Sequence, residues 1–226
     1  MIVTVDGPAA AGKSSVAREL ARRLSVRYLD SGAMYRAVTW RALEQGVNLE
    51  DVPELAHVAR EARLDVQTRP GGERVLCDGV DVTEAIRTPR VTEAIYRLAD
   101  QRDVRAALIE QQQAIGRRYD LVAEGRDQGT DVFPRADVKF YLDASLEERA
   151  RRRYGDMQRA GETTTLDEVR RQLQERDAKD SSRPVGALRR DADMVVVDST
   201  NMSPRQVVDV MLAEIERRGM LPRQER

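Results

Sequence analysis

Residues 7–15 read GPAAAGKSS and follow the apolar run IVTV (residues 2–5) and a single aspartate. The segment matches the pattern G-x-x-x-x-G-K-[S/T] of a phosphate-binding loop. Glycine lets backbone N–H groups approach phosphate oxygens, and a following helix adds the partial positive charge of its N-terminus. We therefore predict strand, loop and helix in succession, with a bound nucleoside triphosphate. The predicted triphosphate-binding residues are Gly7, Pro8, Ala9, Ala10, Ala11, Gly12, Lys13, Ser14 and Ser15.

Two side chains of this loop have separate predicted tasks. Lys13 is expected to reach the β- and γ-phosphates, and the Ser14 hydroxyl is expected to bind a Mg²⁺ ion that arrives with the triphosphate. The alternative is an ordinary glycine-rich turn, which the strand–loop–helix context disfavours.

The rest of the chain alternates short β-branched runs with long helical ones. This alternation is typical of an α/β fold with a parallel sheet flanked by helices. The predicted strands are 2–5, 26–30, 120–124, 138–143 and 194–198. The predicted helices are 13–24, 33–45, 104–116, 146–160, 165–178 and 204–218.

Two segments depart from this alternation. Residues 64–88 contain short alternating runs around the turn signals PGG (70–72) and DG (78–79), which predicts a small inserted antiparallel element. Residues 153–187 are highly charged, rich in arginine and helical on both sides of Gly161. This second segment is either a solvated surface hairpin or a mobile cover over the site, and the two interpretations are compatible.

Composition excludes several classes of protein. The net charge is −1, so a nucleic-acid-binding polycation is not expected. Of the 38 lysines and arginines, three are lysines, which leaves 35 arginines. Cys77 is the only cysteine of the sequence and His57 the only histidine. These counts disfavour disulfide frameworks, zinc clusters and Ser-His-Asp hydrolysis. No apolar run approaches the roughly 20 residues needed to span a bilayer. We expect a soluble, cytoplasmic monomer with no membrane or nucleic-acid partner.

The triphosphate could serve a kinase, an ATPase, a GTPase switch or a regulator without turnover. No N-K-x-D guanine motif is present, which disfavours the switch. The segment LDSGAMYRAV (29–38) brings Ser31, Tyr35 and Arg36 to one predicted helix end. A hydroxyl, a ring and a guanidinium suit a nucleoside monophosphate acceptor. A capped helix with a core tyrosine would give the same pattern.

Five segments together carry a specific resemblance. They are GPAAAGKSSVA (7–17), LDSGAMYR (29–36), DGVDVTEAIRT (78–88), EGRDQGTDVFPRADVKFYLDAS (124–145) and ERDAKDSSRPVGAL (175–188). In this order they resemble the bacterial cytidylate kinases of the nucleoside monophosphate kinase group, over about residues 1–215. The resemblance implies a P-loop NTPase fold with a five-stranded parallel sheet, a monophosphate-binding insert and a helical lid. It implies transfer of phosphate from ATP to CMP or dCMP.

The resemblance also divides the chain. It implies one P-loop kinase domain over residues 1–226, with a core, a monophosphate-binding insert at about 48–101 and a lid at about 153–187. The core comprises about 1–47, 102–152 and 188–226. The residues expected to contact CMP are Ser31, Tyr35, Arg36, Arg105, Arg126, Asp127, Asp180 and Arg183. The residues expected to be catalytic are Lys13, Arg126, Arg152, Arg153, Arg176 and Arg183.

Within the GRD segment, Arg126 suits the acceptor phosphate or the transferring group, and Asp127 suits the cytosine amine. Three positions depart from the family pattern, namely Tyr96, Gln128 and Asp131, and Tyr96 puts one detail of base or sugar recognition in doubt. Another P-loop kinase of a small metabolite or monophosphate would explain the loop, and so would a nucleotide-binding regulator. An assay with several nucleoside monophosphates distinguishes these alternatives.

Overall fold

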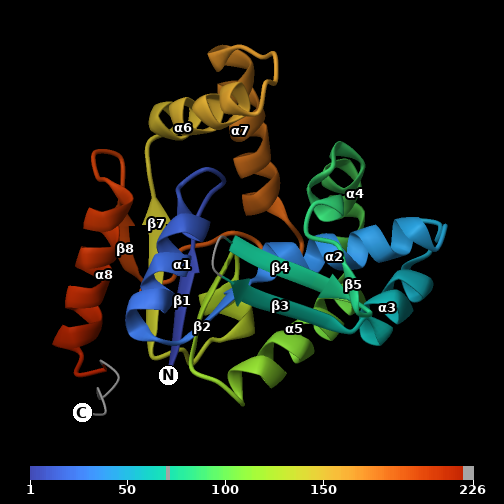
Figure 1. Ribbon diagram of the computed structural model, residues 1–226, viewed down its shortest axis with the longest axis horizontal. Helices are drawn as coiled ribbons and strands as arrows, with labels where there is room; N and C mark the ends of the chain where they lie inside the picture. Colours follow the sequence, from blue (N-terminus) through green and yellow to red (C-terminus); the bar gives the residue numbers. More distant parts are fainter. Residues whose placement is uncertain (70–71, 221–226) are drawn as a thin grey trace. The chain divides into compact units, whose positions relative to one another are not determined.

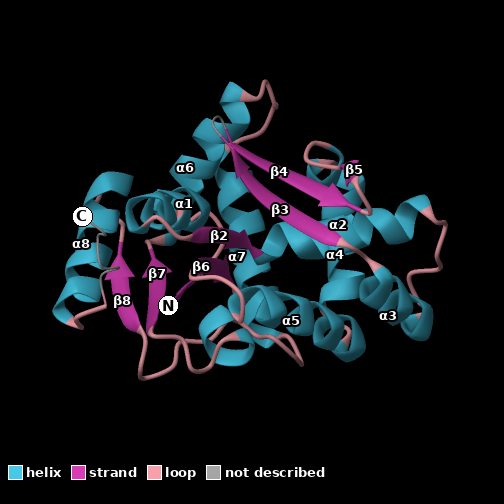
Figure 2. Ribbon diagram, turned by 60° about the horizontal axis from the view of Figure 1, so that its bottom comes forward, coloured by secondary structure: helices cyan, strands magenta, loops and turns pink. Residues whose placement is uncertain are grey.

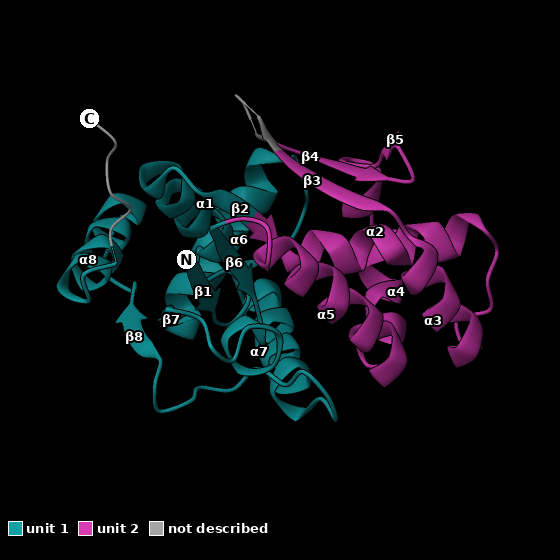
Figure 3. Ribbon diagram, turned by 90° about the horizontal axis from the view of Figure 1, so that it is seen from below, with its two compact units in different colours: residues 1–28, 120–226 teal, residues 29–119 magenta. Residues whose placement is uncertain are grey.

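The computed structural model describes residues 1–69 and 72–220 (Figure 1). Residues 70 and 71 of the predicted PGG turn lie outside the described residues. The chain forms two compact units, residues 1–28 with 120–226 and residues 29–119 (Figure 3). Within the described ranges, no helix is both long and apolar enough to cross a bilayer.

The first unit is built around a five-stranded sheet in the order β2-β6-β1-β7-β8. The strands are β1 (Ile2–Asp6), β2 (Arg27–Asp30), β6 (Leu121–Gly125), β7 (Val138–Asp143) and β8 (Val195–Asp198). Central strand β1 runs parallel to both β6 and β7. Strand β7 runs parallel to β8, and Figure 2 shows these two strands side by side. The predicted parallel α/β sheet is confirmed.

Helices α1 (Lys13–Leu24) and α8 (Pro204–Arg217) share one apolar core with the sheet. In α1 the buried side chains recur every three or four residues, as expected for a helix with one face on a core. Helix α8 begins with a capping box formed by Ser203 and Gln206, and its first residue, Pro204, is the predicted start.

The charged segment folds as two helices, α6 (Leu146–Arg159) and α7 (Leu166–Ser182). They pack on each other through a small apolar cluster of Ala150, Val169 and Leu173 that also contains Ala9 of the phosphate loop. Helix α7 extends beyond its predicted end at residue 178, because Asp180 is buried within ion pairs near the last turn. The charged segment therefore has apolar packing between its two helices, in which the phosphate loop takes part.

The second unit contains four helices and a small sheet among its described residues. The helices are α2 (Ser31–Glu44), α3 (Val52–Glu61), α4 (Pro89–Ala99) and α5 (Arg102–Gly116). The strands β3 (Leu64–Arg69), β4 (Gly72–Cys77) and β5 (Val80–Asp81) form an antiparallel sheet, which confirms the predicted antiparallel element. Its apolar side chains pack on α2 around Ala37, Val75 and Ile86.

Two helix predictions in this unit need correction. Helix α2 begins at Ser31 rather than at residue 33, because the Asp30 carboxylate accepts a hydrogen bond from Ala33 N at 2.9 Å and caps the helix there. Helix α4 was not predicted, although Pro89 at its first turn and the buried Val91, Ala94 and Leu98 are typical helix signals.

Candidate active site

The phosphate loop connects β1 to α1 through strained backbone. Ala10 and Gly12 have φ angles of 60° and 95°, and Gly12 is the N-cap residue of α1. Among the described residues, no side chain caps this helix, and its first turn contains no acidic residue. The first amides of α1 therefore suit an anion in place of a side-chain cap. Ser14 and Ser15 are exposed at this helix end.

Lys13 lies inside the loop rather than in solvent. Its side chain is 7% exposed, and Nζ donates to the Pro8 carbonyl at 2.8 Å. Burial, followed by the positive charge of Arg126, lowers the pKa of Lys13 to about 7, against the opposing effect of Glu124. A neighbouring phosphate would favour the charged ammonium and raise this pKa again.

ATP binding at pH 8 is therefore expected to take up about one proton per ATP, because Lys13 is mostly neutral before binding and charged afterwards. Titration calorimetry in two buffers of different ionisation enthalpy measures this number. At pH 6 Lys13 already carries its proton, so the uptake should disappear. The absence of uptake at pH 8, or equal uptake at both pH values, would contradict the assignment.

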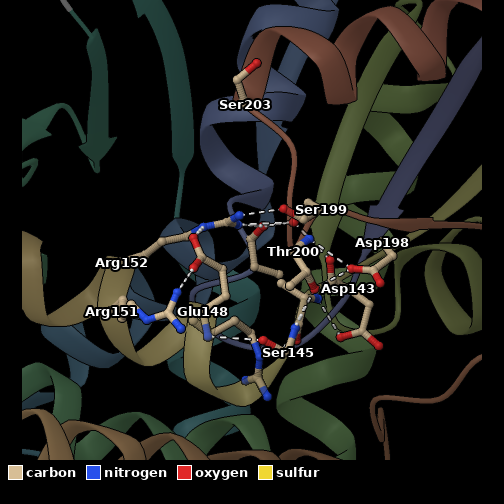
Figure 4. Close-up of polar contacts among 12 residues, drawn as sticks. Asp143, Ser145, Glu148, Arg151, Arg152, Asp198, Ser199, Thr200 and Ser203 are labelled. Carbon is tan, nitrogen blue, oxygen red and sulfur yellow. Dashed lines mark hydrogen bonds and ion pairs between the residues drawn. The ribbon is translucent and has the colours of Figure 1, made fainter.

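Arg152 of α6 lies beside Ala11 of the phosphate loop. Its guanidinium donates from Nη1 to Ala11 O at 3.3 Å and from Nη2 to Ser199 O at 2.6 Å, and Nε donates to Glu148 at 3.0 Å. Figure 4 shows the guanidinium directed at Ser199, with Glu148 beside it. Arg152 thus joins α6, the loop and the segment after β8. Of the other predicted lid arginines, Arg153 is exposed and Arg176 is half-buried.

Arg149 is a residue that sequence reasoning missed. It is 6% exposed, and Nη1 donates to Ala9 O at 3.2 Å. Its Nε donates to Ala144 O at 3.0 Å, while Nη2 pairs with Asp177 of α7 at 2.7 Å. This guanidinium of α6 therefore connects the loop with α7. The sequence offered no signal, because α6 contains several arginines at similar spacing.

The turn after β6 carries the predicted acceptor residues Arg126 and Asp127. Arg126 Nε donates to Asp180 Oδ2 at 2.7 Å, and Arg183 Nη2 lies 3.0 Å from the other oxygen of Asp180. Asp180 is 2% exposed. Burial alone would raise its pKa, but the charges of Arg126 and Arg183 outweigh burial and lower the pKa. The structure brings Arg126, Asp180 and Arg183 together, and it buries Asp127 in the same turn.

The remaining predicted acceptor residues belong to the second unit. Ser31 and Tyr35 are buried on α2, and the guanidinium carbon of Arg105 lies 5.4 Å from the centre of the Tyr35 ring. Arg105 also donates to Ala99 O at 3.2 Å. Arg36 donates to Ile86 O at 3.1 Å and to a threonine hydroxyl at 2.9 Å. Tyr35 and Arg105 thus form one cation–π pair within this unit.

Comparison with known proteins gives a consistent result. A family model described as cytidylate kinase matches residues 3–217. The cytidylate kinase of Rhodopirellula baltica is 46% identical over 212 residues, which cover 94% of this chain and 91% of that protein. The bifunctional pantoate ligase/cytidylate kinase of Synechococcus sp. is 43% identical over 211 residues, but this chain spans only 39% of its length.

A solved structure shows a similar fold. The uncharacterized protein from Eubacterium ventriosum has a TM-score of 0.55 at 11% identity, covering 96% of this chain and 98% of that one. At this identity the likeness concerns the fold alone.

Proposed function

The chain belongs to the cytidylate kinase family, and from this premise we propose that it transfers the γ-phosphoryl group of ATP to CMP or dCMP, giving ADP and CDP or dCDP. The observation that supports this most strongly is the group of Arg126, Asp180 and Arg183 in the same unit as the phosphate loop. Two guanidiniums around one carboxylate leave a net charge of +1 in a largely buried place, which suits a phosphate dianion.

On the donor side, the loop amides and the Lys13 ammonium bind the ATP phosphates and stabilise the charge that develops during transfer. Arg152 and Arg153 of α6 act with the donor nucleotide, and Arg176 acts near the transferring group. Electrostatic influence of Arg176 on both Lys13 and Asp180 supports this placement. Lid closure over these groups excludes water, which would otherwise hydrolyse ATP.

On the acceptor side, we propose that the acceptor residues predicted from the sequence bind CMP. Arg126 and Arg183 bind its phosphate, and Asp127 accepts from the cytosine amine. The residues proposed to complete CMP binding are Ser31, Tyr35, Arg36, Arg105 and Asp180. The acceptor phosphate has a second pKa of about 6 and is already ionised at neutral pH. No general base is therefore required, in agreement with a single histidine that lies exposed on α3.

Magnesium fits this site as an ion carried by ATP. Among the described residues, no cluster of three or more His, Cys, Asp or Glu side chains could hold a metal. The Ser14 hydroxyl is a hard oxygen donor, exposed at the start of α1, and we propose it as the protein ligand. When bound, the ion neutralises charge on the β- and γ-phosphates.

A coupled assay with ATP and each of CMP, dCMP, UMP, AMP and GMP tests this function. We expect the highest kcat/KM with CMP or dCMP. A clear preference for another monophosphate would assign a different kinase activity. Binding of ATP without turnover of any acceptor would support a regulator instead.

Asp127→Asn is expected to reduce the CMP/UMP ratio of kcat/KM at least about tenfold, with the KM for ATP little changed. A carboxylate accepts from the cytosine amine and repels the uracil carbonyl, whereas an amide can turn to suit either base. A base-edge contact of this kind is worth about 1–3 kcal/mol of discrimination. Steady-state kinetics with both acceptors measure the ratio.

Asp131→Asn provides a matched control, because it makes the same change in the same turn. Asp131 pairs with Arg189 at 2.8 Å rather than with a predicted substrate group. Its substitution should leave the CMP/UMP ratio unchanged. If Asp127→Asn lowers both activities without changing their ratio, Asp127 only shapes the turn.

A further inference from the structure

Asp6 is a buried carboxylate that the proposed mechanism does not use. It is the last residue of β1 and is 0% exposed. Oδ1 accepts a hydrogen bond from Gln128 N at 2.9 Å, and Oδ2 accepts one from Gly129 N at 2.7 Å. Both oxygens are therefore engaged by consecutive backbone amides of the turn that follows β6.

This turn carries Arg126 and Asp127, immediately before the two amides that Asp6 holds. Strand pairing places Asp6 opposite Gly125, so the two strands end at the same level of the sheet. One residue later in the chain, Gly7 opens the phosphate loop. The side chain of Asp6 thus reaches the acceptor turn, while its backbone leads directly into the donor loop.

The turn also presses closely on β1. A Cβ atom at Gly129 would lie 2.8 Å from Thr4 Oγ1, closer than packed side chains tolerate. The following residues form a tight π-type turn, Gln128–Val132, whose amides at 131 and 132 both donate to Asp127 O. A shift of the amides at 128 and 129 would therefore move Asp127 as well.

Burial of the Asp6 carboxylate is unfavourable for the stability of the folded protein. Burial, and less strongly the negative charge of Asp127, raises the pKa of Asp6 to about 7, against the two amide hydrogen bonds and the charge of Lys13. Tyr141 is its register partner on β7, and Lys139 approaches the turn from the same strand. A neutral side chain would avoid the burial penalty, but only a carboxylate supplies two acceptors to two adjacent amides.

From this geometry we infer that Asp6 is a positioning residue, which fixes Arg126 and Asp127 for CMP by holding the backbone of their turn against β1. The inference rests on the proposed function. It adds a residue that never touches CMP to the determinants of acceptor binding, and it predicts that acceptor kinetics respond to Asp6 more than donor kinetics do.

Asp6→Asn tests this inference. The asparagine amide can accept from one backbone N–H, but its NH₂ group opposes the other, so the turn must shift. We expect kcat/KM for CMP to fall at least about tenfold, through KM more than kcat, with the KM for ATP within about threefold. With ATP saturating, so that the bound phosphates keep Lys13 protonated, kcat/KM of the wild-type protein for CMP should show an ionisation near pH 7 that the variant lacks.

Thr4→Val is the matched control. Thr4 lies two residues earlier on β1 and is equally buried, and within the described residues its hydroxyl has no hydrogen-bond partner. This substitution should leave acceptor kinetics within about twofold. Equal losses for CMP and ATP in Asp6→Asn, or an unchanged pH profile, would overturn the positioning role. Failure of the wild-type protein to phosphorylate CMP would instead overturn the proposed function.

A measurement on the wild-type protein covers the case in which Asp6→Asn does not fold. Backbone amide NMR signals of Gln128 and Gly129 should titrate together as Asp6 changes its charge, with a midpoint near pH 7. The Asp127 signal should follow with the same midpoint if the turn moves as a unit. Signals at 128 and 129 that titrate while that of Asp127 stays constant would overturn the inference, and so would no titration at all.

Discussion

Replacement of Lys13 by methionine is expected to lower kcat for phosphoryl transfer by about a hundred- to a thousandfold, while the protein remains folded. A preorganised charge in a buried site is worth far more to the transition state than a charge in water, and its removal has effects of this order. Methionine fills nearly the same buried space, so packing around the loop is retained. Single-turnover and steady-state assays with ATP and CMP measure the loss.

The same substitution lowers kcat but should increase the stability of the folded protein. The folded-state pKa of Lys13 lies near 7, below its unfolded value of 10.5, so the folded protein holds an unfavourable buried charge at pH values below 7. Lys13→Met should therefore raise the free energy of unfolding most below pH 7. The gain should shrink as pH rises from 7 towards 10.5, where both states become neutral. Denaturant unfolding at pH 6 and pH 9.5 tests this.

Lys139→Met is the control. It shows whether the loss of kcat comes from the missing charge of Lys13 or from the removal of any buried lysine. Lys139 is as buried as Lys13 and lies in the same unit, but it pairs with Asp193 at 2.6 Å. Its substitution should lower stability, because it breaks an ion pair, and should leave kcat within about threefold. More than a few per cent of wild-type turnover in folded Lys13→Met protein would contradict the assigned role.

Local signals explain why much of the fold was predictable. The phosphate loop follows a strand and opens a helix, and the predicted strands at 2–5 and 194–198 are rich in the β-branched residues typical of a parallel sheet. Helix starts were predictable where a cap and proline stand together, as at Ser203 and Pro204. The start of α2 was misplaced by two residues, since Asp30 was assigned to the end of a strand although its side chain also caps the next helix.

The candidate site was less predictable, because its buried contacts join residues far apart in the chain. Arg149 and Arg152 lie one turn apart on α6, yet Arg149 binds Ala9 O and α7, whereas Arg152 binds the segment after β8. Helical periodicity cannot distinguish these two positions. Asp6 likewise resembles any acid at a strand end until the order of the strands places the turn of β6 beside it.

Gly7→Ala is expected to lower the free energy of unfolding by about 3 kcal/mol or more, or to prevent folding. Gly7 has a φ of +152°, which only glycine adopts readily. A Cβ atom there would lie 2.0 Å from the backbone oxygen of Leu142. Leu142 is fully buried in β7 and paired with Val197 of β8, so this oxygen cannot retreat without disturbing the sheet.

Gly46→Ala is a reference substitution at a positive φ without a steric contact. Gly46 also has a positive φ, +66°, but nothing lies within 4 Å of an added Cβ. Its substitution should therefore cost only the left-handed strain of about 1–2 kcal/mol. Urea unfolding of both variants under one set of conditions gives the difference, and the excess for Gly7→Ala measures the steric contact with β7 together with the larger backbone strain at φ +152°. If the two variants were destabilised equally, the phosphate loop would not depend on close approach to that strand, and glycine at position 7 would serve only the φ angle.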